Sequence, residues 1–162
     1  MPLSIKNLLQ SQKTILKNYT QLSHKDLLTE LISIFGLNQH KLFLGDDYVL
    51  TCDNFLKCLL VMLRVRSKIP VILMGETGCG KTSLIKFLAL KLLKVRMETI
   101  DFHAGITSEF IIEKMEIYAK IASELESGNQ LWVFLDEINT CDSMGLLSEI
   151  VTKNRVQGKD LP

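Results

Sequence analysis

The chain has 162 residues, enough for one domain with its own core, and its formal net charge at pH 7 is +1. Because 19 basic residues nearly balance 18 acidic ones, the charge gives no reason to expect nucleic acid or an anionic membrane as the main partner. With 47% hydrophobic and 23% charged residues and no apolar run long enough for a transmembrane segment, the composition is typical of a globular protein.

Residues 1–47 are predicted to form a helical N-terminal segment. Ser23 has the features of a helix N-cap, because Asp26 follows three residues later. Apolar residues at helical spacing continue to Phe35, and Gly36 is a typical residue for the end of a helix. The stretch 42–48, with Gly and Asp at its centre, predicts a loop.

Residues 48–162 are predicted to form a second unit. Thr51 is the expected cap of a helix whose inward face carries Phe55, Leu56, Leu59, Met62 and Leu63. A short apolar run follows between Pro70 and Gly75, and it predicts a buried parallel strand at 71–74.

Helices and strands alternate in the remainder of the chain. We expect helices at 82–94, 108–125 and 143–153, a strand at 97–102 and a buried strand at 131–135. In the first of these helices Leu84, Ile85, Leu88 and Leu92 should face inward. This alternation predicts an α/β domain with a mainly parallel sheet and flanking helices.

A complete phosphate-loop pattern, Gly-x-x-x-x-Gly-Lys-Thr, joins the strand at 71–74 to the helix at 82–94. Its glycines allow a backbone path in which successive N–H groups face an anion, and the helix that follows adds its positive end. Lys81 is expected to reach the β- and γ-phosphates of ATP, and the Thr82 hydroxyl to ligate Mg²⁺. The predicted nucleotide-binding residues are Gly75, Glu76, Thr77, Gly78, Cys79, Gly80, Lys81, Thr82 and Ser83.

Two carboxylates follow the apolar strand at 131–135. The carboxyl end of a strand in an open α/β sheet is where such folds place ligand-binding groups. We therefore expect Asp136 to hold Mg²⁺ and Glu137 to polarise the water that attacks ATP.

Together these residues resemble the AAA+ ATPases, with Gly75–Thr82 as Walker A and the run Phe-Leu-Asp-Glu-Ile-Asn-Thr at 134–140 as Walker B. More narrowly, residues 48–162 are similar to the ATPase units of the mysterin family, giant RING-finger E3 ubiquitin ligases with dynein-like AAA+ modules. Stretches at 48–54, 69–82, 102–107, 136–141 and 145–150 carry this likeness.

The resemblance implies a P-loop NTPase sheet in the order five-one-four-three-two, a sensor-1 residue on strand four, a helical lid, and an arginine finger from a neighbouring AAA+ module. The sequence ends before a strand four, so the domain at 48–162 is expected to be partial, with strands one to three only. Strand four would lie between the strands at 71–74 and 131–135, and both should therefore have an unpaired edge. A module that binds ATP without hydrolysing it, and an inactive truncated fragment, remain alternatives.

Three further side chains have an open role. His103 could hydrogen-bond Glu137, although a backbone partner in its loop is the simpler expectation. Cys79 lies beside Lys81 and is a candidate for alkylation that ATP would block. Arg155 is expected to be a solvated loop arginine. The four cysteines lack metal-ligand spacing and are predicted to be reduced thiols of a cytoplasmic protein.

Overall fold

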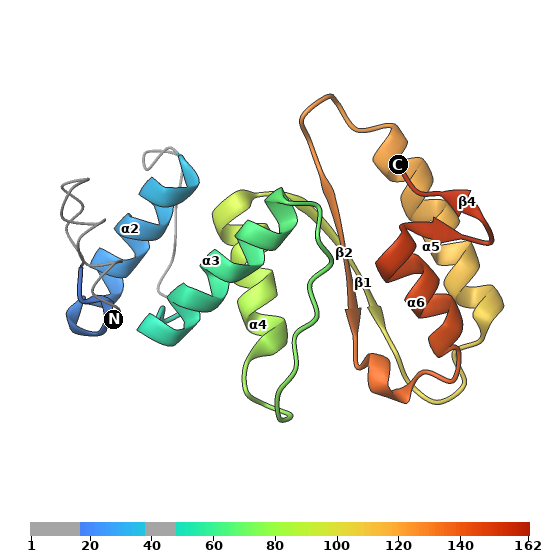
Figure 1. Ribbon diagram of the computed structural model, residues 1–162, viewed down its shortest axis with the longest axis horizontal. Helices are drawn as coiled ribbons and strands as arrows, with labels where there is room; N and C mark the ends of the chain where they lie inside the picture. The colour runs from blue at the N-terminus through green and yellow to red at the C-terminus, as the bar shows by residue number, and fades with distance from the viewer. Residues whose placement is uncertain (1–16, 38–47) are drawn as a thin grey trace, which may run out of the picture.

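The computed structural model describes residues 17–37 and 48–162 (Figure 1). The loop predicted at 42–48 lies outside the described residues except for Tyr48, and so do residues 1–16 and 38–41 of the predicted N-terminal segment. Among the described residues, no helix is both long and apolar enough to cross a membrane.

The first described segment is helical, as predicted. A 3₁₀ turn, η1 (Tyr19–Gln21), precedes α2 (His24–Phe35). Ser23 and Asp26 form the predicted capping box, in which each side chain accepts a hydrogen bond from the other residue's backbone N–H. Gly36 ends the helix with a φ of 68°.

Helix α3 (Cys52–Arg66) begins after Thr51, whose hydroxyl accepts from the Asn54 N–H at 3.2 Å, as predicted. The expected inward face was wrong for Leu56 and Leu63, which are exposed. Leucines at 56, 60 and 63 form a second helical stripe beside the buried one, so spacing alone did not decide which stripe packs. The residues buried in α3 are Phe55, Cys58, Val61 and Met62.

Two side-chain contacts attach α2 to the unit that follows. The Leu50 N–H donates to His24 Nδ1 at 2.7 Å. At the other end of α2, Arg66 donates to the Phe35 carbonyl at 3.1 Å and lies over its ring. These bonds fix α2 against α3 in addition to their shared apolar core.

The helix predicted at 82–94 is present but changes its hydrogen bonding partway along. It consists of α4 (Lys81–Lys86) and a π-helical continuation, η3 (Phe87–Leu93). The four residues expected to face inward are all buried: Leu84, Ile85, Leu88 and Leu92.

A parallel pair of strands lies at the centre of the fold. Strands β1 (Arg96–Asp101) and β2 (Leu131–Asp136) pair in register from Arg96↔Leu131 to Asp101↔Asp136. Side chains on one face of β2, such as Trp132 and Phe134, pack with the core of α3, α4 and η3. The alternate residues pack with α5 (Ser108–Ser123) and α6 (Met144–Lys153), which lie on the other side of the strands in Figure 1.

Two small elements complete the structure. The 3₁₀ turn η4 (Ile138–Thr140) follows β2, and a short antiparallel hairpin, β3 (Arg155–Val156) with β4 (Lys159–Asp160), follows α6. The strands at 97–102 and 131–135 and the helices at 108–125 and 143–153 are thus confirmed to within two residues at each boundary.

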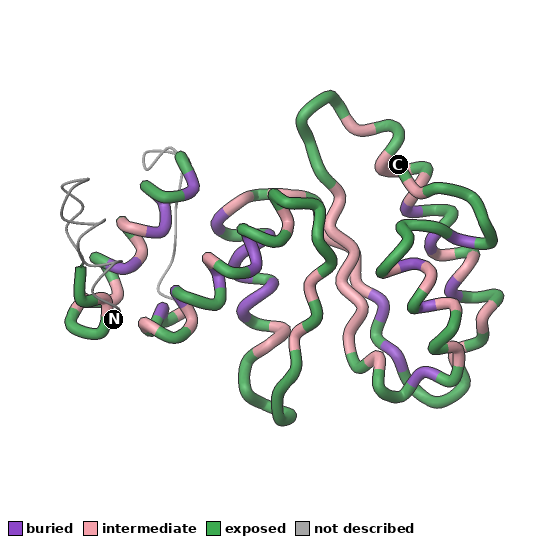
Figure 2. Tube along the Cα trace, in the orientation of Figure 1, coloured by how far each residue is buried: buried purple, intermediate pink, exposed green. Residues whose placement is uncertain are grey.

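The predicted buried strand at 71–74 is not formed. Residues 69–76 have no regular structure, and Ile72 and Met74 are 64% and 90% exposed. A strand needs a neighbour for its backbone groups, and no described segment lies beside this one as a pairing partner. For the same reason β2 is half-buried along its whole length rather than fully buried, which Figure 2 shows as an unbroken intermediate colour.

Candidate functional site

The predicted phosphate loop turns back on itself between residue 75 and the start of α4. Gly78 and Gly80 have φ values of 80° and 82°, a left-handed conformation that costs a residue with a Cβ about 1 kcal/mol or more. A Cβ at Gly75 would lie 3.0 Å from the Cys79 Sγ, so the loop also closes tightly across its width. This backbone path therefore favours glycine at 78 and 80 and leaves little room for a Cβ at 75.

Lys81, at the first position of α4, reaches back across the loop. Its Nζ donates hydrogen bonds of 3.0 Å to the carbonyl oxygens of Gly75 and Glu76, and lies 3.9 Å from Cys79 Sγ. These contacts hold the ammonium group at the mouth of the loop, where its positive charge is partly exposed.

Asp136 ends β2 and faces the start of α4. Its Oδ2 accepts a 2.8 Å hydrogen bond from the Thr82 hydroxyl, and its Oδ1 accepts one of 3.1 Å from the Glu137 N–H. The carboxylate therefore joins the loop-bearing helix to the end of the strand. This is the contact expected if the two sequence motifs form one site.

Glu137 has a left-handed backbone, with a φ of 53°. Its carbonyl oxygen accepts two hydrogen bonds from Thr140, one from the N–H at 3.0 Å and one from the hydroxyl at 2.9 Å. A non-glycine residue keeps this conformation when its surroundings hold it there. Thr140 was not among the residues predicted for the site, and the one signal for it in the sequence is a hydroxyl residue three positions after the glutamate.

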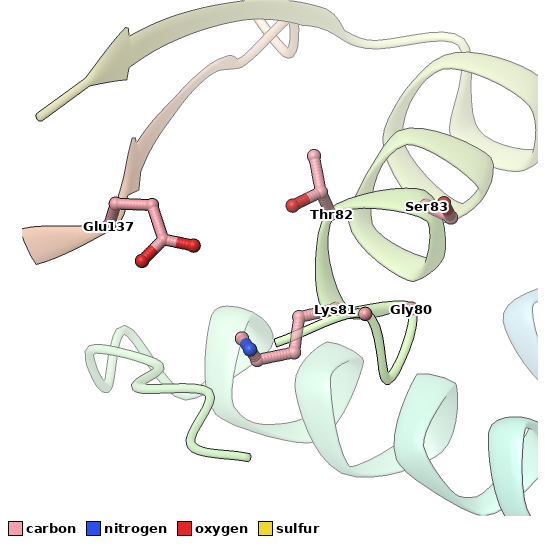
Figure 3. Close-up of a pocket in the computed structure, with 6 residues that line it drawn as sticks. Gly80, Lys81, Thr82, Ser83 and Glu137 are labelled. Carbon is pink, nitrogen blue, oxygen red and sulfur yellow. The ribbon is translucent and has the colours of Figure 1, made fainter. Parts of the chain in front are cut away.

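A pocket of about 200 Å³ lies between these elements (Figure 3). In Figure 3 the side chains of Lys81, Thr82 and Glu137 extend toward the same space from opposite sides, while Ser83 lies on the far side of Thr82. The other predicted nucleotide-binding residues, Glu76, Thr77, Cys79 and Gly75, do not line the pocket. Its lining is Gly78, Gly80, Lys81, Thr82, Ser83 and Glu137.

The remaining predictions concern side chains outside this pocket. His103 contacts the Ala104 carbonyl through Nδ1 at 3.1 Å, so the backbone-partner interpretation is confirmed and the suggested bond to Glu137 is not found. Arg155 pairs with Asp160 in the exposed hairpin. All four cysteines are free, as predicted; Cys79 is exposed, whereas Cys58 is buried. Burial raises the pKa of the Cys58 thiol to about 12.

Comparison with known proteins gives a consistent family. The model of the RNF213 AAA domain matches residues 48–162. The chain is 41% identical over 122 residues to the mouse (Mus musculus) E3 ubiquitin-protein ligase RNF213, covering 72% of this chain and 2% of that protein. It is 39% identical over 120 residues to human (Homo sapiens) RNF213, covering 70% and 2%.

A fish relative extends the match into the N-terminal residues. The chain is 33% identical over 155 residues to E3 ubiquitin-protein ligase rnf213-beta of Danio rerio, covering 90% of this chain and 3% of that protein. The chain thus spans only a few hundredths of the length of these relatives. The resemblance to AAA+ units of the mysterin type is confirmed, and the chain belongs to the RNF213 AAA domain family.

Proposed function

We propose that this chain supplies the phosphate-binding and carboxylate halves of an AAA+ ATP site. The observation that carries the proposal is the 2.8 Å hydrogen bond between Thr82 and Asp136, which brings the phosphate loop and the end of β2 together around one pocket. In this proposal the nucleotide-binding unit is residues 48–162, and helix α2 belongs to the segment that precedes it. Free cysteines fit a reducing compartment such as the cytoplasm.

Lys81 and the loop backbone would bind the phosphates. The glycines at 78 and 80 place successive backbone groups at the pocket, and the ammonium group of Lys81 adds a positive charge next to them. Because Lys81 Nζ is held by two loop carbonyls, its position is set before a ligand arrives. Glu76, Thr77 and Cys79 would shape the loop and not contact phosphate through their side chains.

The oxygens of Thr82 and Asp136 fit a magnesium site. Mg²⁺ prefers hard oxygen ligands, and adjacent ligands of an octahedral Mg²⁺ lie about 3 Å apart, close to the 2.8 Å observed here. The described residues contain no cluster of three or more acidic, histidine or cysteine ligands. The ion would therefore need phosphate oxygens and water to complete its shell, as is usual for Mg²⁺ with nucleotides. When bound, it would offset negative charge on the β- and γ-phosphates.

We propose Glu137 as the general base. Its carboxylate faces the pocket from the residue that follows β2, opposite Lys81 and Thr82 in Figure 3, and its carbonyl accepts hydrogen bonds from Thr140. We infer that this chain is part of a longer parent protein, as its 2–3% coverage of the relatives suggests, and that Glu137 orients and deprotonates a water for ATP hydrolysis in that parent. In the parent protein, neighbouring AAA+ modules would complete the site. The parent would also be an E3 ubiquitin-protein ligase, as the relatives are named.

A matched pair of lysine variants tests the nucleotide site. Lys81→Ala in the 162-residue chain should abolish saturable binding of a fluorescent ATP analogue with Mg²⁺. Lys86→Ala should not, because Lys86 is an exposed residue of the same helix that does not line the pocket. Equal binding by the two variants would contradict the proposal.

Hydrolysis needs a separate test in the full-length parent protein. Glu137→Gln should bind ATP normally but slow its turnover by about a hundredfold or more, since general-base catalysis typically contributes 10²–10⁴-fold. If the module binds ATP without hydrolysing it, ATP turnover by this module should be absent in the unaltered parent as well as in Glu137→Gln. In that case the bound ATP would have a structural role only.

A further inference from the structure

A second and larger cavity lies away from the nucleotide pocket. It has a volume of about 530 Å³ and runs between the last residues of β1, the loop that follows, and one side of α5. It shares no lining residue with the pocket beside Lys81. Its lining comprises Thr99, Ile100, Asp101, His103, Gly105, Ile106, Thr107, Phe110, Lys114 and Tyr118.

One wall of this groove is the open edge of a sheet. Strand β1 pairs with β2 on one side, and the described residues supply no strand for its other side. The Phe102 N–H donates to the Asp136 carbonyl at 3.0 Å, which fixes which residues face β2. In a parallel ladder, alternate residues direct both backbone groups to the same neighbour. Thr99 and Asp101 therefore direct their N–H and C=O groups to the open edge.

These outward backbone groups have no partner within the described residues. No bond from the backbone of Thr99 or Asp101 to another group of residues 17–37 or 48–162 is present. Two donors and two acceptors, repeated at every second residue, thus line the groove. An added strand has backbone donors and acceptors at the same two-residue spacing and can pair with all four groups. A compact small molecule does not carry such a repeat.

The opposite wall is one face of α5. Phe110, Lys114 and Tyr118 are spaced by four residues and so share that face. Phe110 is 39% exposed, and Lys114 Nζ lies 5.5 Å from its ring centroid. Among the described residues Lys114 has no carboxylate partner. The wall therefore offers apolar surface with a single uncompensated positive charge.

We propose that the groove between the open edge of β1 and α5 binds an extended polypeptide segment, which adds a strand to the sheet and sets an acidic side chain against Lys114. The backbone of Thr99 and Asp101 would provide the pairing, and the apolar surface of Phe110 would take a neighbouring side chain. The Asp101 carboxylate should not repel the acidic side chain of the peptide. Side chains alternate between the two faces of a strand, and that of the preceding residue, Ile100, packs toward α5, so the Asp101 side chain belongs to the other face. The groove does not depend on nucleotide binding at Lys81.

Synthetic peptides test the groove directly. Acetylated hexapeptides with alternating Val and Thr, in which Glu occupies each position in turn, would be titrated into the ¹⁵N-labelled 162-residue chain. At least one should bind saturably below about 1 mM and shift the amide signals of Thr99, Asp101 and Lys114. N-methylation of alternate peptide nitrogens should abolish its binding. Failure of the whole set to bind, or binding that survives N-methylation, would overturn the proposal.

Variants of the chain localise the contact. Thr99→Pro removes an outward N–H without touching the bonds to β2, and it should abolish binding, whereas Thr99→Val should not. Lys114→Glu should lower the affinity for the Glu-containing peptide by about tenfold. It should raise the affinity for the same peptide with Lys in place of Glu. Circular dichroism would show that each variant is folded. If Thr99→Pro unfolds, the Lys114→Glu variant tests the proposal instead. An unchanged preference of that variant for the Glu-containing peptide would contradict the proposed contact with Lys114.

Discussion

The Thr82 hydroxyl donates a 2.8 Å hydrogen bond to Asp136 and so connects the first turn of α4 to the end of β2. The two residues are 54 positions apart in the chain. No backbone hydrogen bond of the sheet connects the residues before the phosphate loop to β2. This side-chain contact is therefore the direct polar link between the two halves of the proposed ATP site.

Removing this link should uncouple Mg²⁺ from nucleotide binding. Thr82→Val preserves the shape of the side chain but loses the hydroxyl, so we expect the gain in ATP-analogue affinity on adding Mg²⁺ to disappear. Thr82→Ser keeps the hydroxyl and should retain that gain. Fluorescence titrations with Mg²⁺ and with EDTA measure the difference, and a full Mg²⁺ effect in Thr82→Val would argue against this ligand.

Thr140 should act on turnover through the backbone of Glu137. Thr140→Val removes the 2.9 Å bond from its hydroxyl to the Glu137 carbonyl. In the full-length parent we expect kcat for ATP to fall by about tenfold, with nucleotide affinity unchanged, because a misplaced base affects the chemical step. Thr140→Ser should restore kcat. A parallel loss of affinity would instead indicate a general disturbance of the site.

The cysteines should differ in their reaction with a maleimide. Cys79 is exposed at the phosphate loop, whereas Cys58 is fully buried in the core. Cys79 should therefore be labelled in the folded chain, and Cys58 only after unfolding. Bound ATP with Mg²⁺ should protect Cys79, as mass spectrometry of the labelled peptides would reveal. Equal labelling of Cys79 with and without ATP would place the nucleotide elsewhere.

Alkaline pH should destabilise the fold through Cys58. Burial raises the pKa of its thiol from 9.0 to about 12, so the folded chain holds this proton over a range in which the unfolded chain loses it. The contribution to stability is complete below pH 9 and is lost progressively as the pH rises toward 12. Tyr48, whose pKa is also raised to about 12 mainly by burial, acts in the same direction.

Urea unfolding at several pH values checks this contribution. The free energy of unfolding should fall less steeply between pH 9 and 12 in Cys58→Ala than in the unaltered chain. Cys52→Ala, at a half-buried position of the same helix, serves as the matched control. An identical slope in Cys58→Ala and the unaltered chain would refute the assignment.

The π-helical turn after α4 offers a matched pair of leucines. Leu88 is fully buried, and its replacement by Ala should cost about 2–5 kcal/mol of unfolding free energy. Leu90 is 46% exposed, and the same change there should cost about 0.5 kcal/mol or less. Urea unfolding measures both. Similar losses for the two would mean that this segment does not pack as described.

Local patterns predicted most of the regular elements. The capping box at Ser23 and Asp26, the cap at Thr51 and the inward face from Leu84 to Leu92 depend on neighbouring residues, and all are present. The prediction failed where packing had to choose between two similar stripes, as at Leu56 and Leu63. Lys81 and Thr82 were predicted from the loop pattern and Glu137 from its place after an apolar strand, and both of these signals are local.

The sequence by itself determined which chemical groups are available: a phosphate-loop pattern, a helix after it, and two carboxylates after an apolar strand. Only the tertiary structure decided that Thr82 meets Asp136, that Thr140 holds Glu137, and that residues 71–74 stay outside the sheet. The physical reason is that these outcomes depend on partners distant in the chain. A segment whose side chains are apolar enough for a buried strand still needs a neighbouring strand to satisfy its backbone hydrogen bonds, and the local sequence does not specify that neighbour.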